Sequence, residues 1–177
     1  WKELFPEMHR VVKPSGNIVI HTAVPFMYEI VGYEKPNYHF AWQKTRPTGH
    51  LNAKKEPLRD IEEILVYKNS PKAQYFPQMK GEEEGSKYNQ KQKSYESKHK
   101  GSYPRLFLGK YPHITQKETP KSIHDELTKF IINSYTQEGD TIFDFCCCDE
   151  NNGTIAESMG RNYIGTDISN KYFGKTN

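Results

Sequence analysis

The chain opens with apolar residues at the spacing of one helix face, and we expect a helix from the first residue or earlier to about residue 12. Residues 13–16 (KPSG) carry the turn chemistry that ends it. Residues 17–23 (NIVIHTA) are rich in Ile and Val, which predicts a buried strand. Because no capping residue precedes the helix, we expect further sequence upstream. The apolar positions of this helix are Trp1, Leu4, Phe5, Met8, Val11 and Val12.

Two further short runs have the composition of strands. Residues 38–44 (YHFAWQK) form the first run. Residues 63–67 (EILVY), where aliphatic side chains are concentrated, form the second. The segment between them, residues 45–59 (TRPTGHLNAKKEPLR), has no hydrophobic period and contains two prolines. We therefore predict a loop there.

The second half of the chain has a clearer pattern. Thr119 followed by Pro120 is a favourable helix start, with a capping side chain and a proline at the first helical position. Residues 141–145 (TIFDF) predict a strand, residues 152–159 a helix that ends at a glycine, and residues 162–167 (NYIGTD) a second strand. Strand, helix and strand in this order form the repeating unit of an open α/β sheet, so we expect the α/β class.

Composition changes this picture between about residues 74 and 104. This stretch has few aliphatic residues and many Lys, Glu, Ser and Gln. It cannot bury enough apolar surface to offset the entropy of ordering it, so we predict a mobile insertion. The low overall content of hydrophobic residues, 34%, fits a modest core interrupted by such a segment.

Several kinds of site are disfavoured by the sequence. The three cysteines are adjacent, at positions 146–148, so they are poorly placed for a disulfide, and they lack the spacing of a zinc site. The histidines show no paired ligand spacing. No apolar stretch approaches the roughly 20 residues that span a bilayer, so we expect no membrane segment.

Charge gives weaker information. The net charge of +3 is small, and acidic and basic residues are mixed. The predicted loop is nevertheless basic, which suits a surface that neutralises phosphates and offers side chains for stacking on bases. A solvated charged face explains the same residues equally well, and charge alone leaves both readings open. The candidate DNA contacts are Trp42, Lys44, Arg46, His50, Lys54, Lys55 and Arg59.

Two acidic residues mark a candidate nucleoside site. Asp144 and Asp167 end the two strands of the predicted α/β unit, close to the roughly 20-residue spacing of nucleotide-binding units. An acid at the second position can accept hydrogen bonds from ribose hydroxyls, although ordinary strand-end acids would look the same. The turn between the first strand and the helix, residues 144–152, has no glycine and carries acidic residues. It is therefore unsuited to a phosphate but compatible with a cationic ligand such as a sulfonium.

Several segments together resemble a known family. Residues 1–20, 42–68, 75–79 (YFPQM), 113–118 (HITQKE) and 141–173 resemble, in this order, motifs of the permuted class of S-adenosylmethionine-dependent DNA amino-methyltransferases. In that class the target-reaction motif precedes the cofactor motif. The resemblance covers nearly the whole chain apart from about residues 82–102, and the segment 42–68 is closest to a phage and bacterial branch.

The resemblance implies a fold and a function. It implies a Rossmann-like methyltransferase sheet, incomplete in this chain, with residues 1–73 and 105–177 as two parts of the core and residues 74–104 as a target-recognition insertion. It implies methyl transfer to an adenine or cytosine amino group of double-stranded DNA, in the cytoplasm of a bacterial or phage-infected cell. Asp167 would hold the ribose of the cofactor, and residues 42–59 would face DNA. The other cofactor-binding positions would be Thr115, Gln116, Lys117, Asp144, Phe145 and Cys146.

The chain also departs from the family pattern. Residues 148–152 (CDENN) stand where G-S-G-T-T is expected, and Ile114 and Glu118 replace two prolines. The catalytic D-P-P-Y type loop is not in this sequence, and in this class we expect it upstream of Trp1. The resemblance thus implies that this chain alone is inactive and that its open sheet edge favours self-association. The alternatives are a non-catalytic relative that binds DNA or a protein through the same scaffold, or a degenerate gene product.

Overall fold

A computed structural model of the chain describes residues 1–78, 107–108, 120–148 and 151–169, without the side chains of residues 45, 46, 107, 108 and 120–124. The chain divides into two compact units. The first unit comprises Trp1–Ala73 and Pro77–His113, and the second comprises Gln74–Phe76 and Ile114–Asn177. Residues 79–104 of the predicted mobile insertion, together with Thr115, Gln116 and Lys117, lie outside the described residues.

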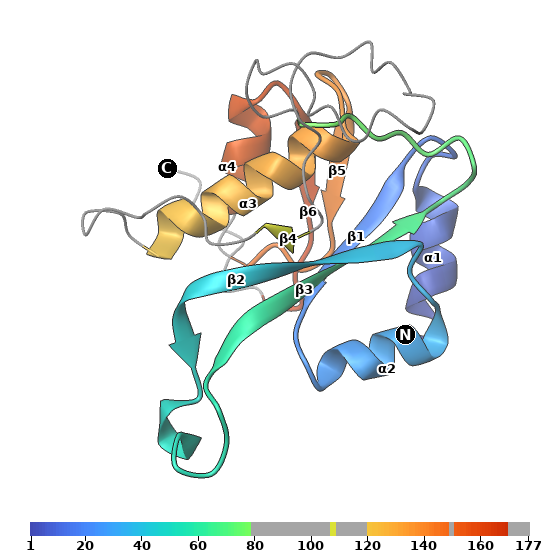
Figure 1. Ribbon diagram of the computed structural model, residues 1–177. Coiled ribbons are helices and arrows are strands. Elements are labelled where there is room, and N and C mark those ends of the chain that lie inside the picture. The colour runs from blue at the N-terminus through green and yellow to red at the C-terminus, as the bar shows by residue number, and fades with distance from the viewer. Residues whose placement is uncertain (79–106, 109–119, 149–150, 170–177) are drawn as a thin grey trace, which may run out of the picture. The chain divides into compact units, whose positions relative to one another are not determined.

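The first unit is built on a mixed sheet with strand order β1-β3-β2-β4 (Figure 1). β1 and β2 both pair with β3 in antiparallel fashion, and β4 pairs with β2 in parallel. Since β3 lies between β1 and β2, it is the best protected of these strands, and its residues Ile64, Leu65, Val66 and Tyr67 are all buried. The elements are α1 (Leu4–Val11), β1 (Asn17–Thr22), α2 (Phe26–Tyr33), β2 (Tyr38–Thr48), η1 (His50–Asn52), β3 (Arg59–Lys68) and β4 (Phe107–Leu108).

The hairpin formed by β2 and β3 is longer than the strand beside it. β1 pairs with β3 only as far as Thr22↔Glu63, whereas the pairing of β2 with β3 continues to Thr48↔Arg59. The outer half of the hairpin therefore extends past the end of β1, with η1 at its tip (Figure 1). Its register shifts between Gln43 and Thr48, which is where a proline that cannot donate a ladder hydrogen bond is tolerated.

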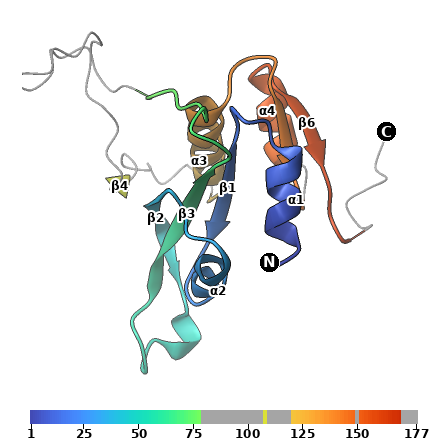
Figure 2. The same cartoon turned by 90° about the vertical axis from the view of Figure 1, so that its right-hand side faces the viewer.

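Helix α1 lies alongside this sheet (Figure 2). The rings of Phe5 and Tyr67 meet edge to face with their centroids 5.0 Å apart, and both side chains are buried. The Tyr67 hydroxyl donates a hydrogen bond to the main-chain oxygen of Glu34, which follows α2 (O–O distance 3.2 Å). Edge-to-face aromatic pairs and satisfied buried hydroxyls both stabilise packing, so Tyr67 connects β3 with the segments around α1 and α2.

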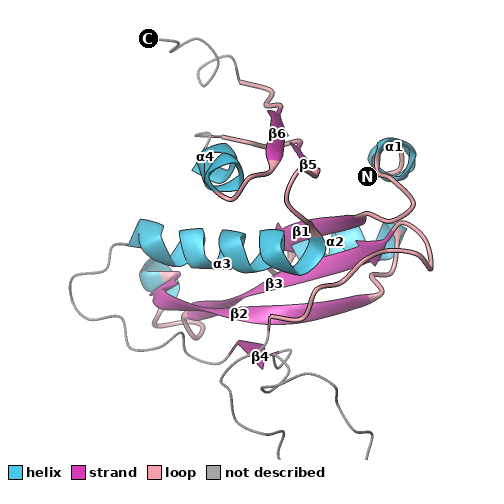
Figure 3. Cartoon of the chain, turned by 90° about the horizontal axis from the view of Figure 1, so that it is seen from above, coloured by secondary structure: helices cyan, strands magenta, loops and turns pink. Residues whose placement is uncertain are grey.

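The second unit contains the predicted strand–helix–strand order. Parallel strands β5 and β6 flank helix α4, which lies beside them (Figure 3). The buried centre of the second unit is formed by Ile132, Ile155 and Ala156, and Tyr163 packs against them. Gly153 allows this packing, because a Cβ atom there would lie 2.7 Å from the Tyr163 ring. The elements are α3 (Pro120–Tyr135), β5 (Thr141–Asp144), α4 (Asn151–Ser158) and β6 (Asn162–Gly165).

Two predictions about elements need correction, and one element was not predicted. The first helix begins at Leu4 instead of at or before Trp1. The predicted loop 45–59 is shorter than expected, since β2 continues to Thr48 and β3 begins at Arg59, which leaves residues 49–58 to connect the two strands of a hairpin. Helix α2 was not predicted, because its apolar residues surround the helix and only Ile30 is buried, so no amphipathic stripe marks it. Among the described residues, no helix is long and apolar enough to cross a membrane.

Candidate functional site

The predicted acidic pair meets at one edge of the second unit. Asp144 is the last residue of β5, and its register partner is Gly165, the last residue of β6. Asp167 follows β6 by two residues. Because β5 and β6 are parallel, both carboxylates lie at the carboxyl edge of the strands, where open α/β sheets bind ligands.

The turn after β5 is hydrogen-bonded to both strand ends. The amide of Cys146 donates to Asp144 Oδ1 (3.1 Å), and the amide of Cys147 donates to the main-chain oxygen of Thr166 (3.0 Å). The amide of Cys148 donates to Asp167 Oδ2 (3.2 Å). Three successive amides thus fix the path of the chain across this edge, and the two carboxylates accept from two of them.

The two carboxylates differ in how many hydrogen bonds they accept. Asp144 Oδ2 accepts hydrogen bonds from Asn152 Nδ2 (3.0 Å) and from the Tyr163 hydroxyl (2.9 Å), in addition to the Cys146 amide on Oδ1. Asp167 accepts from the amides of Cys148 and Ser169, one on each oxygen. A carboxylate offers about four acceptor positions. Among the described residues, Asp144 therefore anchors the turn and α4, whereas Asp167 retains more acceptor capacity for a ligand.

Cys148 has a backbone conformation that normally requires glycine. Its φ of 46° lies in the left-handed region, which costs a side-chain-bearing residue about 1–2 kcal/mol. Cys148 stands at the first glycine position of the G-S-G-T-T pattern that the sequence otherwise lacks. The turn thus keeps a glycine-like path without the glycine, and the Cys148 side chain is exposed.

Replacing Cys148 with glycine is expected to raise the free energy of unfolding by about 0.5–1 kcal/mol. Glycine relieves the left-handed strain and loses part of that gain to its greater freedom in the unfolded chain. Cys146→Gly is the matched control, because Cys146 is also exposed and has no positive φ; it should lower stability by about 0.5–1 kcal/mol. Urea unfolding of both variants measures this, and the same sign of change in the two would contradict the assignment of strain to Cys148.

Two thiols of this turn, those of Cys146 and Cys147, are held in the neutral state. Burial and the nearby carboxylates of Asp144 and Asp167 raise the pKa of both Cys146 and Cys147. Thiolates are the reactive and metal-binding form of cysteine, so these thiols are poor nucleophiles and poor ligands at neutral pH. Within the part of the chain that the structure describes, no group of three or more His, Cys, Asp or Glu residues could hold a metal ion.

The structure brings together only part of the predicted cofactor set. Asp144, Phe145, Cys146 and Asp167 gather at the carboxyl edge of β5 and β6, with Phe145 half-buried. The sequence pattern did not mark the Asn152 and Tyr163 side chains that hold Asp144. Asn152 also accepts a hydrogen bond from the Thr128 hydroxyl (3.1 Å), which connects this edge to α3. These contacts join residues far apart in sequence, and no local motif signals them.

The predicted DNA contacts fall into two groups. His50, Lys54, Lys55 and Arg59 are exposed at the outer end of the β2–β3 hairpin. Glu56 lies among them and forms an ion pair with Arg59 (3.4 Å), so part of the positive charge is offset. The side chain of Arg46 lies outside the described residues. The hairpin tip is therefore a basic, accessible surface with one acidic residue in it.

Trp42 and Lys44 do not belong to that surface. Trp42 is only 2% exposed and meets the His21 ring edge to face, so it does not present its ring to a ligand. The Lys44 ammonium forms an ion pair with Glu62 (3.0 Å) and donates to the Thr48 hydroxyl (3.0 Å). Its side chain is 14% exposed, so its charge is largely satisfied within the protein. Both side chains are therefore engaged within the protein in this structure, and their predicted contact with DNA stays a prediction.

Glu62 on β3, the partner of Lys44, is the centre of a small charged cluster. Glu62 also accepts from His21 Nε2 (2.7 Å). Burial acts to raise the pKa of Glu62, but the hydrogen bonds and charges of Lys44 and His21 outweigh it and lower that pKa below its ordinary value of 4.5. The cluster therefore stabilises the fold above that value, and the contribution disappears as the pH falls through the folded-state pKa.

Comparison with known proteins places this geometry in context. The profile of the N6/N4 methylase family, described as DNA methylase, matches residues 1–177. The type II methyltransferase M2.DpnII of Streptococcus pneumoniae is 26% identical over 179 aligned positions, which cover 92% of this chain and 59% of that protein. This chain thus spans less than two thirds of the length of that relative.

Solved structures share the fold. The complex of M1.HpyAVI with SAM superposes with a TM-score of 0.62 at 21% identity, covering 97% of this chain and 78% of the other. The cytosine-N4-specific PvuII DNA methyltransferase gives a TM-score of 0.64 at 12% identity, covering 99% and 71%. The predicted α/β, Rossmann-like fold class is confirmed by this likeness.

Proposed function

Because this chain belongs to the DNA methylase family, we propose that it carries the cofactor-binding edge and a DNA-facing hairpin of an enzyme that methylates adenine or cytosine amino groups. S-adenosylmethionine is the proposed cofactor, and it supplies a methyl group activated by the adjoining sulfonium. Double-stranded DNA in the cytoplasm of a bacterial or phage-infected cell is the proposed substrate. This chain spans 59% of that relative's length, so the activity of the whole enzyme is part of the proposal.

The observation that carries this proposal is the arrangement of the β5–β6 edge. Asp167 lies at the carboxyl end of the second parallel strand, and its contacts with the described residues leave it acceptor capacity to spare. Cys148 keeps, without the glycine, the left-handed backbone conformation of the glycine position in the family's cofactor loop. A neutral pair of thiols and two carboxylates suit a ligand with a positive charge better than a phosphate. These features fit S-adenosylmethionine.

Individual roles follow from this fit. We propose that Asp167 accepts hydrogen bonds from the ribose hydroxyls and that Phe145 and Cys146 line the pocket. Asp144 acts on the ligand indirectly, because its carboxylate holds the turn through Cys146 and the start of α4 through Asn152. From the family pattern, we further propose that Thr115, Gln116 and Lys117 cover the amino-acid end of the cofactor.

The outer end of the hairpin is the proposed DNA contact. Its exposed basic residues project past β1 on a two-stranded ribbon, which suits contact with the sugar–phosphate backbone. Contacts of this kind neutralise phosphates and carry no sequence information by themselves. The hairpin would thus position the enzyme on DNA, and the recognition sequence would be read elsewhere.

Replacing Lys54 and Lys55 with glutamine should weaken DNA binding uniformly across sequences. Each lost phosphate contact is expected to reduce the slope of log K against log salt by about 0.9. Lys2→Gln together with Lys13→Gln, on exposed residues around α1, is the charge-matched control. Fluorescence anisotropy with duplex DNA at several salt concentrations measures both slopes. An unchanged slope in the hairpin variant, or an equal change in the control, would remove the hairpin from the interface.

The sheet formed by β5 and β6 also bears on assembly. Phe143 and Ile164 are register partners on β5 and β6, and both remain exposed, at 44% and 54%. Two-stranded parallel sheets are normally covered on both faces, so this apolar face favours association with another polypeptide or a second copy of this chain. Sedimentation velocity at low and high concentration tests self-association, and a constant monomer mass would exclude it.

Equilibrium dialysis with radiolabelled S-adenosylmethionine tests the proposed function. We expect saturable binding that S-adenosylhomocysteine displaces, and no transfer of the label to DNA by this chain alone. Transfer to DNA would overturn the proposal that the catalytic loop is missing. DNA binding without cofactor binding would instead favour the alternative, a catalytically inactive DNA-binding module. The observation that supports this alternative is the replacement of the glycine-rich cofactor loop by residues 148–152 (CDENN).

A further inference from the structure

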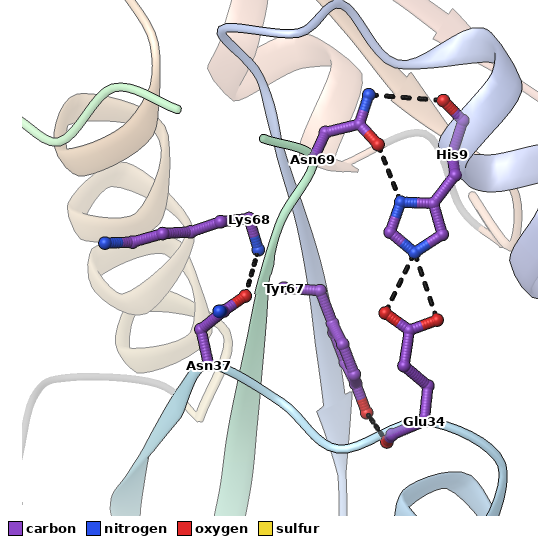
Figure 4. Close-up of polar contacts among 6 residues, drawn as sticks. All are labelled: His9, Glu34, Asn37, Tyr67, Lys68 and Asn69. Atoms are coloured by element: carbon purple, nitrogen blue, oxygen red, sulfur yellow. Dashed lines mark hydrogen bonds and ion pairs between the residues drawn. The ribbon is translucent and has the colours of Figure 1, made fainter. Parts of the chain in front are cut away.

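His9 lies at the meeting point of three segments of the first unit (Figure 4). It belongs to the last turn of α1, and its ring contacts Asn69, which follows β3, and Glu34, which follows α2. The Nδ1 atom is 2.6 Å from Asn69 Oδ1, and the Nε2 atom is 2.9 and 3.1 Å from the two oxygens of Glu34. Both ring nitrogens therefore face polar atoms at hydrogen-bonding distance.

The orientation of the Asn69 amide determines the chemistry of this contact. Its Nδ2 atom donates to the main-chain oxygens of His9 (3.2 Å), Val12 (2.6 Å) and Lys13 (3.2 Å), all at the carboxyl end of α1. An amide turned the other way would point its oxygen at three carbonyl oxygens. Three acceptors thus fix the nitrogen on that side, and the Asn69 oxygen must face His9.

Both partners of the ring are therefore acceptors. A neutral imidazole carries one N–H and could donate to Asn69 or to Glu34, but not to both. The imidazolium form donates from both nitrogens and also places a positive charge at a helix carboxyl end, which favours it. We propose that His9 is a proton-dependent clamp, which in its charged form ties α1 to the segments after α2 and β3 and which loosens when the ring loses its proton.

The surroundings of the ring support this role. Phe5 stacks on it with the centroids 6.4 Å apart, and Glu34 is the charged group that faces it in the described part of the chain. Tyr67 lies next to Glu34, and burial together with that carboxylate raises the pKa of its hydroxyl to about 12, so Tyr67 stays neutral. Burial alone would lower the pKa of His9, but its hydrogen bonds to Asn69 and Glu34 and the Glu34 charge raise that pKa above 6.5.

The sign of the effect on stability follows. A group whose pKa is higher in the folded state stabilises the fold fully below its unfolded-state pKa, here about 6.5, and loses that contribution as the pH rises through the folded-state pKa. The clamp is thus closed at mildly acidic pH and weakens toward alkaline pH. If the folded-state pKa lies one pH unit above the unfolded-state pKa, the folding constant at acidic pH is roughly tenfold larger.

NMR titration of the His9 ring protons in the whole chain tests the proposal. We expect a titration midpoint above 6.5 in the native protein, a lower midpoint in Glu34→Gln, and chemical shifts below the midpoint that show protons on both ring nitrogens. A midpoint at or below 6.5, or a neutral ring at pH 6, would overturn the proposal. The midpoint of the native protein is measured without any substitution, so it does not depend on how well Glu34→Gln folds.

Unfolding experiments supply the control. The ratio of the folding constants of the wild type and His9→Gln should fall as the pH rises from 6 to 9. His39→Gln removes another histidine–glutamate pair, in which His39 Nδ1 lies 2.9 Å from Glu63 and the side chain is 61% exposed. Among the described residues, the His39 ring has no second acceptor. The folding constant of His39→Gln should therefore change with pH much as that of the wild type does. Equal pH dependence in the two variants would contradict a special role for His9.

Discussion

Replacing Asp167 with alanine is expected to weaken S-adenosylmethionine binding by about 10- to 100-fold. Hydrogen bonds to a charged group contribute about 1.5–3 kcal/mol when the partner would otherwise be left unsatisfied. The Asp167 carboxylate is part-buried at the end of β6 and accepts from two main-chain amides, which fix its direction. The proposed ribose contact uses the acceptor capacity that remains.

The same substitution also removes the acceptors of the Cys148 and Ser169 amides, so affinity and stability must be separated. Asp167→Asn keeps an oxygen for one of these amides and loses the charge; we expect a loss of affinity of about tenfold with a smaller loss of stability. Glu157→Ala, an exposed carboxylate on α4, is the control for charge. Wild-type affinity in a folded Asp167→Asn variant would mean that Asp167 only supports the turn.

Replacing Trp42 with alanine should lower the free energy of unfolding by about 3–5 kcal/mol. Trp42 is 2% exposed and lies on the central part of the sheet, where its loss leaves a large cavity. Leu51→Ala, at the fully exposed hairpin tip, should change stability by no more than about 0.5 kcal/mol. Urea unfolding monitored by circular dichroism measures both, and a small effect at Trp42 would contradict its assignment to the core.

DNA binding distinguishes this assignment from a role in stacking on bases. Trp42→Phe should remain folded and keep wild-type affinity for DNA, because the side chain is not presented to a ligand. If Trp42 instead stacked on a base, truncating the stacking surface would cost on the order of 1–3 kcal/mol in DNA affinity. A large loss of affinity in a folded Trp42→Phe variant would restore the DNA-facing role.

The sequence predicted the second unit well, because local signals determine it. The strand, helix and strand around Asp144 and Asp167 each had their own propensity and boundary residues. Gly160, predicted to end the helix, has a φ of 76°, a conformation that glycine adopts without strain. The parallel pairing then follows from the short helical crossover, since strands joined in this way pair in one direction.

The first unit was harder to predict, because its decisive contacts are not local. The outer hairpin looked like a loop, since its strands have no alternating apolar residues and gain order from pairing with each other. Trp42 and Lys44 adjoin a basic segment in sequence, and only the fold shows that one is buried and the other neutralised by Glu62. The His9–Asn69 contact joins residues 60 positions apart, which no pattern reveals.

The central claim is that the carboxyl edge of β5 and β6 binds S-adenosylmethionine, and amide chemical-shift mapping tests it most directly. Titration of the isotopically labelled chain should shift the amide signals of residues 144–148 and 165–169 in a saturable manner, and S-adenosylhomocysteine should shift the same signals. Saturable shifts confined to other residues, or no shifts at millimolar ligand with the spectrum of a folded chain, would contradict the claim.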